Sequence, residues 1–350
     1  MATPEIRIDQ LTGGRVLIAP GRDERPERPE QSGADPWHPS GQEDCPFCEG
    51  HEAETPPEVA ADRPDDSDVD GPGWRTRAFE NLYPALVPES GETGAPEPSS
   101  AFASSADPLL ASSRRSEPDM FASRPAIGRH EVVVNSPRHL SSLTELDEDG
   151  LAAAVAGWRE RMRAHADQPY VQLILNQGPA SGASIEHSHA QVGAAPFVPA
   201  AVARERERFN SYRERTAGAS LLGEVLREEI RRGDRLVAID DEVALICPWA
   251  SRFPYEMRLI PRREAPRFEL SEGGASMLHR ALAALDSLVE GTPQLNLWVK
   301  TAPRGVEHFH WHLDLAPRLE PSSAFEMATG VDINAVAPET AAAKLREAIA

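Results

Sequence analysis

The segment HEVVVNSPRH (130–139) has a counterpart about 124 residues later, YEMRLIPRRE (255–264), and this correspondence determines the fold that we predict. Further pairs follow at about the same offset: LTELDEDGL with RFELSEGGA, YVQLILNQGP with PQLNLWVKTAP, and HSHAQVGAAP with HFHWHLDLAP. A helical pattern lies between the second and third block of each copy. The sequence therefore predicts one unit that occurs twice, with the order strand, strand, helix, strand and a final strand that carries histidines.

Antiparallel strands with helices packed against them define an α+β fold. We place the first unit at 1–200, a charged helical linker at 201–234, and the second unit with its tail at 235–350. In the segment IRIDQLTGGRVLIAPGR (6–22), apolar and polar residues alternate on both sides of a Thr-Gly-Gly turn, which predicts a β-hairpin. Residues 88–124 are rich in Pro, Ser and Ala and predict a mobile insertion.

The composition excludes several classes of function. The net charge of −20 argues against a nucleic-acid partner, because a phosphate backbone would be repelled overall. It permits a nucleotide substrate, which needs only a local basic pocket. No apolar run reaches the roughly 18 residues of a membrane helix, and the first residues lack the pattern of a signal peptide. We therefore expect a cytoplasmic protein without a membrane partner.

The motif CPFC places Cys45 and Cys48 at the spacing of a zinc knuckle. The chain has three cysteines and no second Cys-x-x-Cys, so two further ligands would be histidines from elsewhere. We favour His139 and His187, although the spacing alone leaves the choice among eleven histidines open. Four protein ligands would leave no position for a water molecule, so the predicted zinc is structural. The alternative is a pair of reduced thiols in a loop.

The stretch EHSHAQ contains the candidate nucleophile. If it is a strand, His187 and His189 point to the same side, and an anchored His187 would hold His189 beside it. A neutral imidazole can attack phosphorus without a general base, and Gln191 on the same face could donate to phosphoryl oxygens. The preceding loop, with Gly178, Gly182 and Ser184, could hold a phosphate. Two alternatives remain: structural histidines at a sheet edge, or a metal site formed by all four histidines of the two copies.

These motifs together resemble the galactose-1-phosphate uridylyltransferase family, a duplicated branch of the histidine triad superfamily. The resemblance rests on NQGPASGASIEHSHAQ, CPFC, SPRH and the repeat, and it covers the chain from about Ile6 onward except for the insertion. It implies two tandem histidine-triad-like units, a nucleophile at His189, and a zinc ion. The implied zinc ligands are Cys45, Cys48, His139 and His187.

The resemblance also implies substrate contacts and a partner. The implied homodimer has sites built from both chains. Arg22 and Arg25 would meet phosphates, and Asn81 would lie near the base and ribose. Asn176 and Ser184 would bind phosphoryl groups, while Gln191 would steady the covalent nucleotidyl-histidine. In the segment AFEM, Phe325 and Glu326 would contact the sugar phosphate.

The chain departs from the family pattern in three places. Ser188 replaces the usual proline of His-Pro-His, which is closer to the branch of ADP-glucose phosphorylases. Glu320 stands where the family has a lysine near the sugar-phosphate segment. Some members bind a second metal through a glutamate and three histidines. Here Glu205, His310 and His312 match three of these ligands, and the fourth position falls at Val299 or Lys300.

The leading hypothesis is a ping-pong exchange of a uridylyl group between UDP-glucose and galactose 1-phosphate. The first alternative is an adenylyltransferase of the ADP-glucose phosphorylase type, with phosphate as the acceptor. A nucleotide hydrolase would use water instead. A zinc-stabilised nucleotide-binding module would form no covalent intermediate at all.

Overall fold

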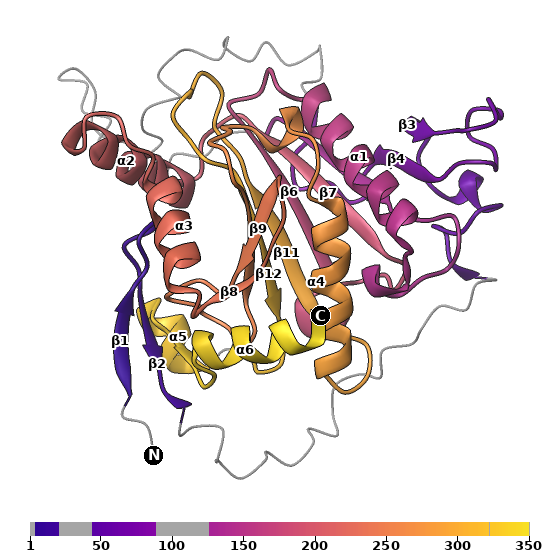
Figure 1. The fold of residues 1–350 in the computed structure, drawn as a ribbon. Helices are drawn as coiled ribbons and strands as arrows, with labels where there is room; N and C mark the ends of the chain where they lie inside the picture. The colour runs from indigo at the N-terminus through magenta and orange to yellow at the C-terminus, as the bar shows by residue number, and fades with distance from the viewer. Residues whose placement is uncertain (1–3, 21–43, 89–125, 322, 350) are drawn as a thin grey trace, which may run out of the picture.

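The protein is built around a ten-stranded sheet in which all neighbouring strands are antiparallel (Figure 1). The structure is a computed structural model that describes residues 4–20, 44–88, 126–321 and 323–349. The strand order is β3-β4-β5-β7-β6-β11-β12-β10-β9-β8. The strands are β3 (Glu58–Asp62), β4 (Thr76–Glu80), β5 (Arg129–Val134), β6 (Tyr170–Gln177), β7 (His189–Ala195), β8 (Leu236–Ile239), β9 (Val243–Ile246), β10 (Met257–Pro261), β11 (Leu295–Lys300) and β12 (His312–Pro317).

This strand order confirms the predicted duplication. From the centre outward, the first half runs β6, β7, β5, β4, β3 and the second half runs β11, β12, β10, β9, β8. The central pair β6–β11 matches Ile174 with Trp298, which is 298 − 174 = 124 residues later, the offset of the repeat. Each unit therefore contributes its fourth strand to a central joint, about which the two halves of the sheet are related by a local two-fold axis.

Of the six α-helices in the described residues, five were expected as helical segments. Asp147 begins α1 (Glu148–Ala164) by accepting a hydrogen bond from the Gly150 N–H. Acidic residues lie in the first turn of this helix and basic residues in the last, which suits the helix dipole. The matching helix of the second unit is α4 (Ala275–Leu288). The linker forms α2 (Ala200–Arg215) and α3 (Leu221–Arg232), and α6 (Pro338–Ile349) lies near the end of the chain. The short α5 (Ala324–Thr329) was not predicted.

The two faces of the sheet have different roles. Helices α1, α4 and α6 cover one face, where Leu151, Trp158 and Leu285 belong to one core that spans both units (Figure 1). On the other face, α2 and α3 cover only the second unit, with Phe209 and Leu222 in their core. The corresponding face of the first unit carries the cysteine motif and His189, so the candidate site lies on this face.

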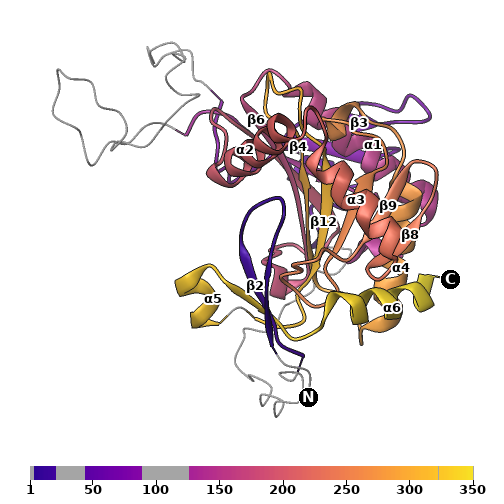
Figure 2. The same cartoon turned by 60° about the vertical axis from the view of Figure 1, so that its left-hand side comes forward.

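The N-terminal hairpin does not join the large sheet. As predicted, β1 (Glu5–Ile8) and β2 (Arg15–Ile18) pair in antiparallel fashion, and Gly13 takes a φ of 72° in the turn between them. β2 also pairs in parallel with β13 (Asp332–Asn334), near the C-terminal end. Figure 2 shows this hairpin beside α5, with its tip directed toward α2. The predicted insertion, apart from Pro88, lies outside the described residues.

Two details of the sequence prediction were wrong. His187 is not on a strand: β7 begins at His189, because the Ser188 backbone hydrogen-bonds to Leu140 and Asn135 outside the ladder. The last pair of the repeat was also aligned two residues off. His187 Nε2 lies 2.8 Å from the Ser136 carbonyl and His310 Nε2 lies 2.8 Å from the Pro261 carbonyl, so His187 corresponds to His310.

Candidate active site

Cys45, Cys48, His139 and His187 form one cluster although they come from three separate segments. Their ligand atoms all lie within 4.8 Å of one another. The His187 Nδ1 atom is 3.6 Å from both sulfurs, and the His139 Nδ1 atom is 3.3 Å from the Cys48 sulfur. A tetrahedron with zinc bonds of 2.0–2.3 Å has edges of about 3.3–3.8 Å, so this spacing suits zinc.

The surroundings of the cluster also fit a metal. Burial, together with the neighbouring Cys45, raises the pKa of the Cys48 thiol to about 12, so the thiolate would need a cation beside it. Burial lowers the pKa of His187 to about 4, which keeps its ring neutral, as ligation requires. The His187 Nε2–H donates to the Ser136 carbonyl, so Nδ1 faces the sulfurs with a free lone pair. This donor set fits a structural zinc ion.

His189 begins β7 and is almost fully buried, with 6% of its surface exposed. Its Nδ1 lies 2.8 Å from the His187 carbonyl, which can only accept, so the proton is on Nδ1 and the Nε2 lone pair is free. The Phe47 ring packs edge-on against the imidazole at a centroid distance of 5.2 Å. Burial lowers the pKa of His189 and favours the neutral form. The residues of the metal cluster thus fix this ring in two ways: His187 supplies the carbonyl that accepts its proton, and Phe47, between the two cysteines, packs against it.

Gln191 extends from the same face of β7 as His189. Its Oε1 atom lies 2.8 Å from Nε2 of His130, a residue of β5 that the sequence analysis did not select. Asn81 follows β4 and lies next to His130, and its Oδ1 accepts a hydrogen bond from the Tyr83 N–H. The structure thus brings Asn81, His130 and Gln191 to one edge of the His189 site.

Asn176 and Ser184 flank the loop that leads to His187. The Asn176 Oδ1 accepts a hydrogen bond of 2.8 Å from Asn296 of β11, and Asn296 also donates to the Ser181 carbonyl. The loop turns at Gly178 and Gly182, whose φ angles of 80° and 87° favour glycine. Ser184 is exposed at the end of the loop. Asn296 was not identified from the sequence, because it belongs to the second unit and meets Asn176 only across the central joint.

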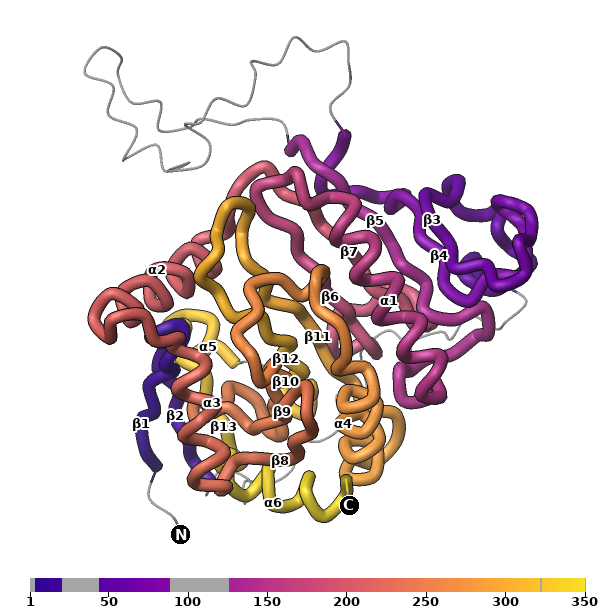
Figure 3. The backbone as a smooth tube through the Cα atoms, turned by 45° about the horizontal axis from the view of Figure 1, so that its top comes forward, coloured from indigo at the N-terminus to yellow at the C-terminus, as the bar shows by residue number. Residues whose placement is uncertain are grey.

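The remaining predicted substrate residues lie elsewhere. Arg22 and Arg25 fall outside the described residues. Phe325 and Glu326 are on α5, beside the N-terminal hairpin and away from β7 (Figure 3). The Phe325 side chain is half exposed, and the Glu326 carboxylate accepts hydrogen bonds from Ser323 at the start of α5.

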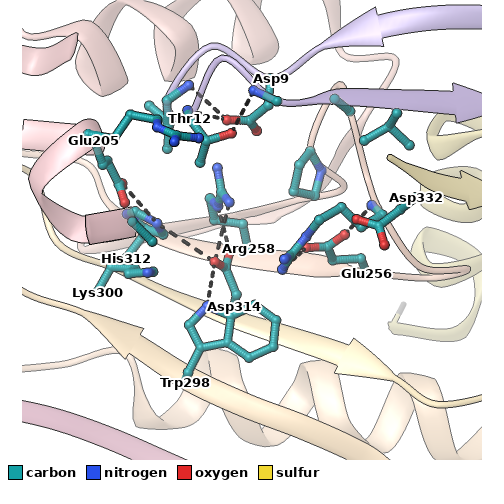
Figure 4. A pocket seen from close by; sticks show the side chains of 18 of the residues that line it. Asp9, Thr12, Glu205, Glu256, Arg258, Trp298, Lys300, His312, Asp314 and Asp332 are labelled. Atoms are coloured by element: carbon teal, nitrogen blue, oxygen red, sulfur yellow. Dashed lines mark hydrogen bonds and ion pairs between the residues drawn. The ribbon is translucent and has the colours of Figure 1, made fainter. Parts of the chain in front are cut away.

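Glu205 and His312 line a cavity of about 570 Å³ that is formed by the N-terminal hairpin, β6, α2 and parts of the second unit (Figure 4). The Glu205 Oε1 is 3.5 Å from the His312 Nε2, and burial raises the pKa of Glu205 to about 7. His310 is not among the residues that line this cavity: its Nε2–H donates to the Pro261 carbonyl, as that of His187 does to Ser136, and its Nδ1 has no hydrogen-bond partner among the described residues. Among the described residues, the Cys/His cluster of the first unit is the only group of three or more such ligands within 4.8 Å.

The charges in this cavity do not suit a second metal either. Five basic side chains line it together with five carboxylates; Arg258 and Lys300 are among the former and Glu205 is among the latter. Arg258 forms an ion pair of 2.6 Å with Asp314; burial alone would raise the pKa of Asp314, but the guanidinium lowers it to about 2. The residues present therefore do not fit a divalent ion. The candidate active site is therefore at His189, two residues after the metal-cluster residue His187 at the end of the glycine-containing loop.

The fold and the site define a histidine-triad-like transferase with a duplicated unit, of which only the first carries the complete cysteine and histidine set. Residues 1–199 match the family described as galactose-1-phosphate uridyl transferase, N-terminal domain, and the chain belongs to this family. No helix in the described ranges is long and apolar enough to cross a bilayer.

Individual relatives extend the similarity over nearly the whole chain. An ADP-glucose phosphorylase of Arabidopsis thaliana is 29% identical, over 99% of this chain and 93% of that protein. A galactose-1-phosphate uridylyltransferase of Cryptococcus neoformans is 25% identical, over 98% and 90%. A crystal structure of an Arabidopsis thaliana ADP-glucose phosphorylase with bound ADP-glucose has a TM-score of 0.76 at 27% identity and covers 99% of each chain. A uridylyltransferase structure has a TM-score of 0.69 at 21% identity and covers 99% of this chain and 98% of its own. At this identity it supports the fold alone.

Proposed function

We propose that the protein transfers a nucleotidyl group between a sugar nucleotide and a phosphate-bearing acceptor through a covalent nucleotidyl-His189. The observation that carries this proposal is the buried His189 ring, with Nδ1–H donated to the His187 carbonyl and Nε2 free. Nε2 attacks the α-phosphorus, and a P–N bond forms as the bond from that phosphorus to the bridging oxygen breaks. The sugar 1-phosphate leaves with the bond electrons. A phosphate oxygen of the acceptor then attacks the same phosphorus, and the P–N bond breaks.

Neighbouring groups would position the substrate for this exchange. The Gln191 and Asn176 amides can donate to phosphoryl oxygens, where charge develops during attack. Ser184 and the backbone of the loop at Gly178 and Gly182 would hold the departing phosphate. Zinc, held by the two cysteines with His139 and His187, would supply rigidity to the segment from which His189 extends, and no step passes through it.

The first pair of substrates that we propose is UDP-glucose with galactose 1-phosphate. The family to which the chain belongs supports this pair, and so do the curated uridylyltransferases among its relatives. The second candidate pair is ADP-glucose with inorganic phosphate. Three observations favour it: the 29% identity to an ADP-glucose phosphorylase, Ser188 in place of proline, and Glu320 in place of lysine.

A donor and acceptor matrix tests both pairs. The protein is incubated with UDP-glucose or ADP-glucose, and then with galactose 1-phosphate, inorganic phosphate or no acceptor. Intact-mass and peptide mass spectrometry should find a uridylyl or adenylyl group on His189, and one acceptor should discharge it. The matched control is His279→Asn, a helical histidine outside the site, which should label as the wild type does. Free UMP or AMP without acceptor would identify a hydrolase, and an unlabelled His189 with every donor would refute nucleotidyl transfer.

We further propose that two chains complete each site. Helix α5, which carries Phe325 and Glu326, lies with the second unit and away from β7, the strand that begins with His189 (Figure 3). A partner chain could present this helix to the open face beside β7, together with Arg22 and Arg25 of the N-terminal segment. A mixed dimer of a His189→Asn chain and a Glu326→Ala chain should then keep one intact site. Activity of about half the wild-type dimer supports sharing, and activity equal to the average of the two parent variants contradicts it.

A further inference from the structure

We propose that His130 is a positioning residue that fixes the orientation of the Gln191 amide in the active site. This inference rests on the proposed transfer to His189, and it adds a residue that the motif did not contain. Its basis is a short series of hydrogen bonds that runs from the backbone of residue 85 to the side chain of Gln191. Each bond in the series determines the direction of the next.

The series begins with a donor whose role is fixed. The backbone N–H of Ala85 lies 3.0 Å from Nδ1 of His130. A backbone N–H can only donate, so the His130 Nδ1 must be the acceptor, and the proton of the neutral ring is on Nε2. The loop that follows β4 therefore determines which tautomer His130 adopts.

The tautomer in turn determines which end of the Gln191 amide faces His130. The His130 Nε2–H lies 2.8 Å from the Gln191 Oε1 and donates to it. The reversed amide would place its NH2 group against another donor, so this orientation is disfavoured. The Asn81 amide nitrogen is 3.4 Å from the same Nε2, and as a donor it cannot replace Gln191 as the acceptor.

The consequence concerns the other end of the amide. Among the described residues, the Gln191 NH2 group has no hydrogen-bond partner. Gln191 pairs with Val132 between β7 and β5, so His130 and His189 each lie two residues away on the same face of their strands. With the Oε1 held by His130, the two N–H bonds remain for phosphoryl oxygens beside His189. A reversed amide would present a carbonyl oxygen to that negative charge and would oppose the reaction.

Two substitutions divide the two functions of the His130 ring. His130→Asn keeps an acceptor near the Nδ1 position for the Ala85 N–H but removes the donor to Gln191. His130→Gln places an amide N–H near the Nε2 position and keeps that donor. We expect His130→Asn to slow the single-turnover labelling of His189 about 10- to 100-fold with little change in KM, and His130→Gln to restore most of the rate. Equal rates for His130→Asn and the wild type would overturn the inference.

A double-mutant cycle then tests whether His130 acts through Gln191. In a Gln191→Ala background, His130→Asn should have no further effect on labelling, whereas an unchanged 10-fold or larger effect would assign His130 another role. Zinc content and thermal melting identify any variant that is misfolded. Nitrogen-15 NMR of wild-type protein with labelled histidine is independent of the variants, and a proton on the His130 Nδ1 would contradict the proposal. If wild-type His189 takes no label at all, it is the proposed function that fails.

Discussion

Single atoms decide the different roles of the two histidines in EHSHAQ. In His187 the proton is on Nε2, which donates to the Ser136 carbonyl, and Nδ1 faces the metal cluster. In His189 the proton is on Nδ1, which donates to the His187 carbonyl, and Nε2 is free. Neutral rings of opposite tautomer, two residues apart, thus suit the roles that we propose for them, a metal ligand at His187 and a nucleophile at His189. The residue types could be predicted from the sequence, but the tautomers depend on backbone carbonyls that only the folded chain brings near.

At the scale of the residue, the role of zinc binding can be tested separately from the transfer reaction. Cys48→Ser should lower the bound zinc below one equivalent per chain and lower the melting temperature, because the hydroxyl is a poor zinc ligand. Transfer activity should fall as a consequence, since Phe47 and the His187 carbonyl support His189. Elemental analysis and calorimetry measure the first two quantities.

The matched control is Cys247→Ser, because Cys247 is also buried but lies in the core of the sheet. Its zinc content should stay at the wild-type value even if its stability falls. Full zinc occupancy in Cys48→Ser would contradict the assignment of Cys48 as a ligand.

At the scale of the element, a buried ion cluster joins helix α1 to strand β5. The Glu131 carboxylate accepts from Arg161 at 2.8 Å and from His165 at 2.7 Å, and it is only 1% exposed. Burial alone would raise the pKa of Glu131, but the hydrogen bonds from His165 and Arg161 lower it below its usual value. Neighbouring His130 projects from the opposite face of β5, so this cluster also holds the strand that carries it.

Removing the Glu131 carboxylate should therefore destabilise the folded protein. We expect Glu131→Ala to lower the free energy of unfolding by about 3 kcal/mol, since it leaves the buried Arg161 guanidinium without its charge partner and the His165 ring without its acceptor. Glu160→Ala is the control: its carboxylate lies 3.7 Å from Arg161 but is half exposed, and we expect a loss of less than about 1 kcal/mol. Urea denaturation at neutral pH measures both.

The contribution of Glu131 should also depend on pH. Its pKa is lowered in the folded state, so its stabilisation is present above the ordinary value near 4.5 and is lost as the pH falls through the folded value. The difference between wild type and Glu131→Ala should thus be larger at pH 7 than at pH 3. A difference that grows on acidification would contradict the assigned ion cluster.

At the scale of the whole molecule, the two units share one sheet and one core. The joint pairs β6 with β11, and the core behind it includes Leu175 from the first unit and Leu297 from the second. A fragment of residues 1–199 would expose β6 as an apolar edge strand, so we expect it to aggregate, unlike the full chain. Size-exclusion chromatography and circular dichroism test this, with the full chain of 350 residues as the control. A monomeric, folded fragment would contradict a joint that is essential for stability.

At the scale of the whole molecule, we can also compare the features that were predicted from the sequence with those that were not. The repeat, five helical segments and the four members of the metal cluster could be predicted, because each depends on a local pattern or a motif. His130 and Asn296 could not, because their partners, Gln191 and Asn176, depend on strand register across 61 and 120 residues of chain. The short α5 did have local signals that the sequence analysis did not use, namely the capping box of Ser323 and Glu326 and the C-cap glycine Gly330. The pairing of β13 with the hairpin had none, since it depends on contact between distant segments.

The pairing of β13 with β2 has a consequence for the order of events during synthesis. Val16 lies opposite Asp332, so strands near the two ends of the chain, 332 − 16 = 316 residues apart, complete one small sheet. On a ribosome, the hairpin emerges before β13 and must wait for synthesis of the intervening residues before this neighbour arrives. A segment made early would thus be late to reach its final place.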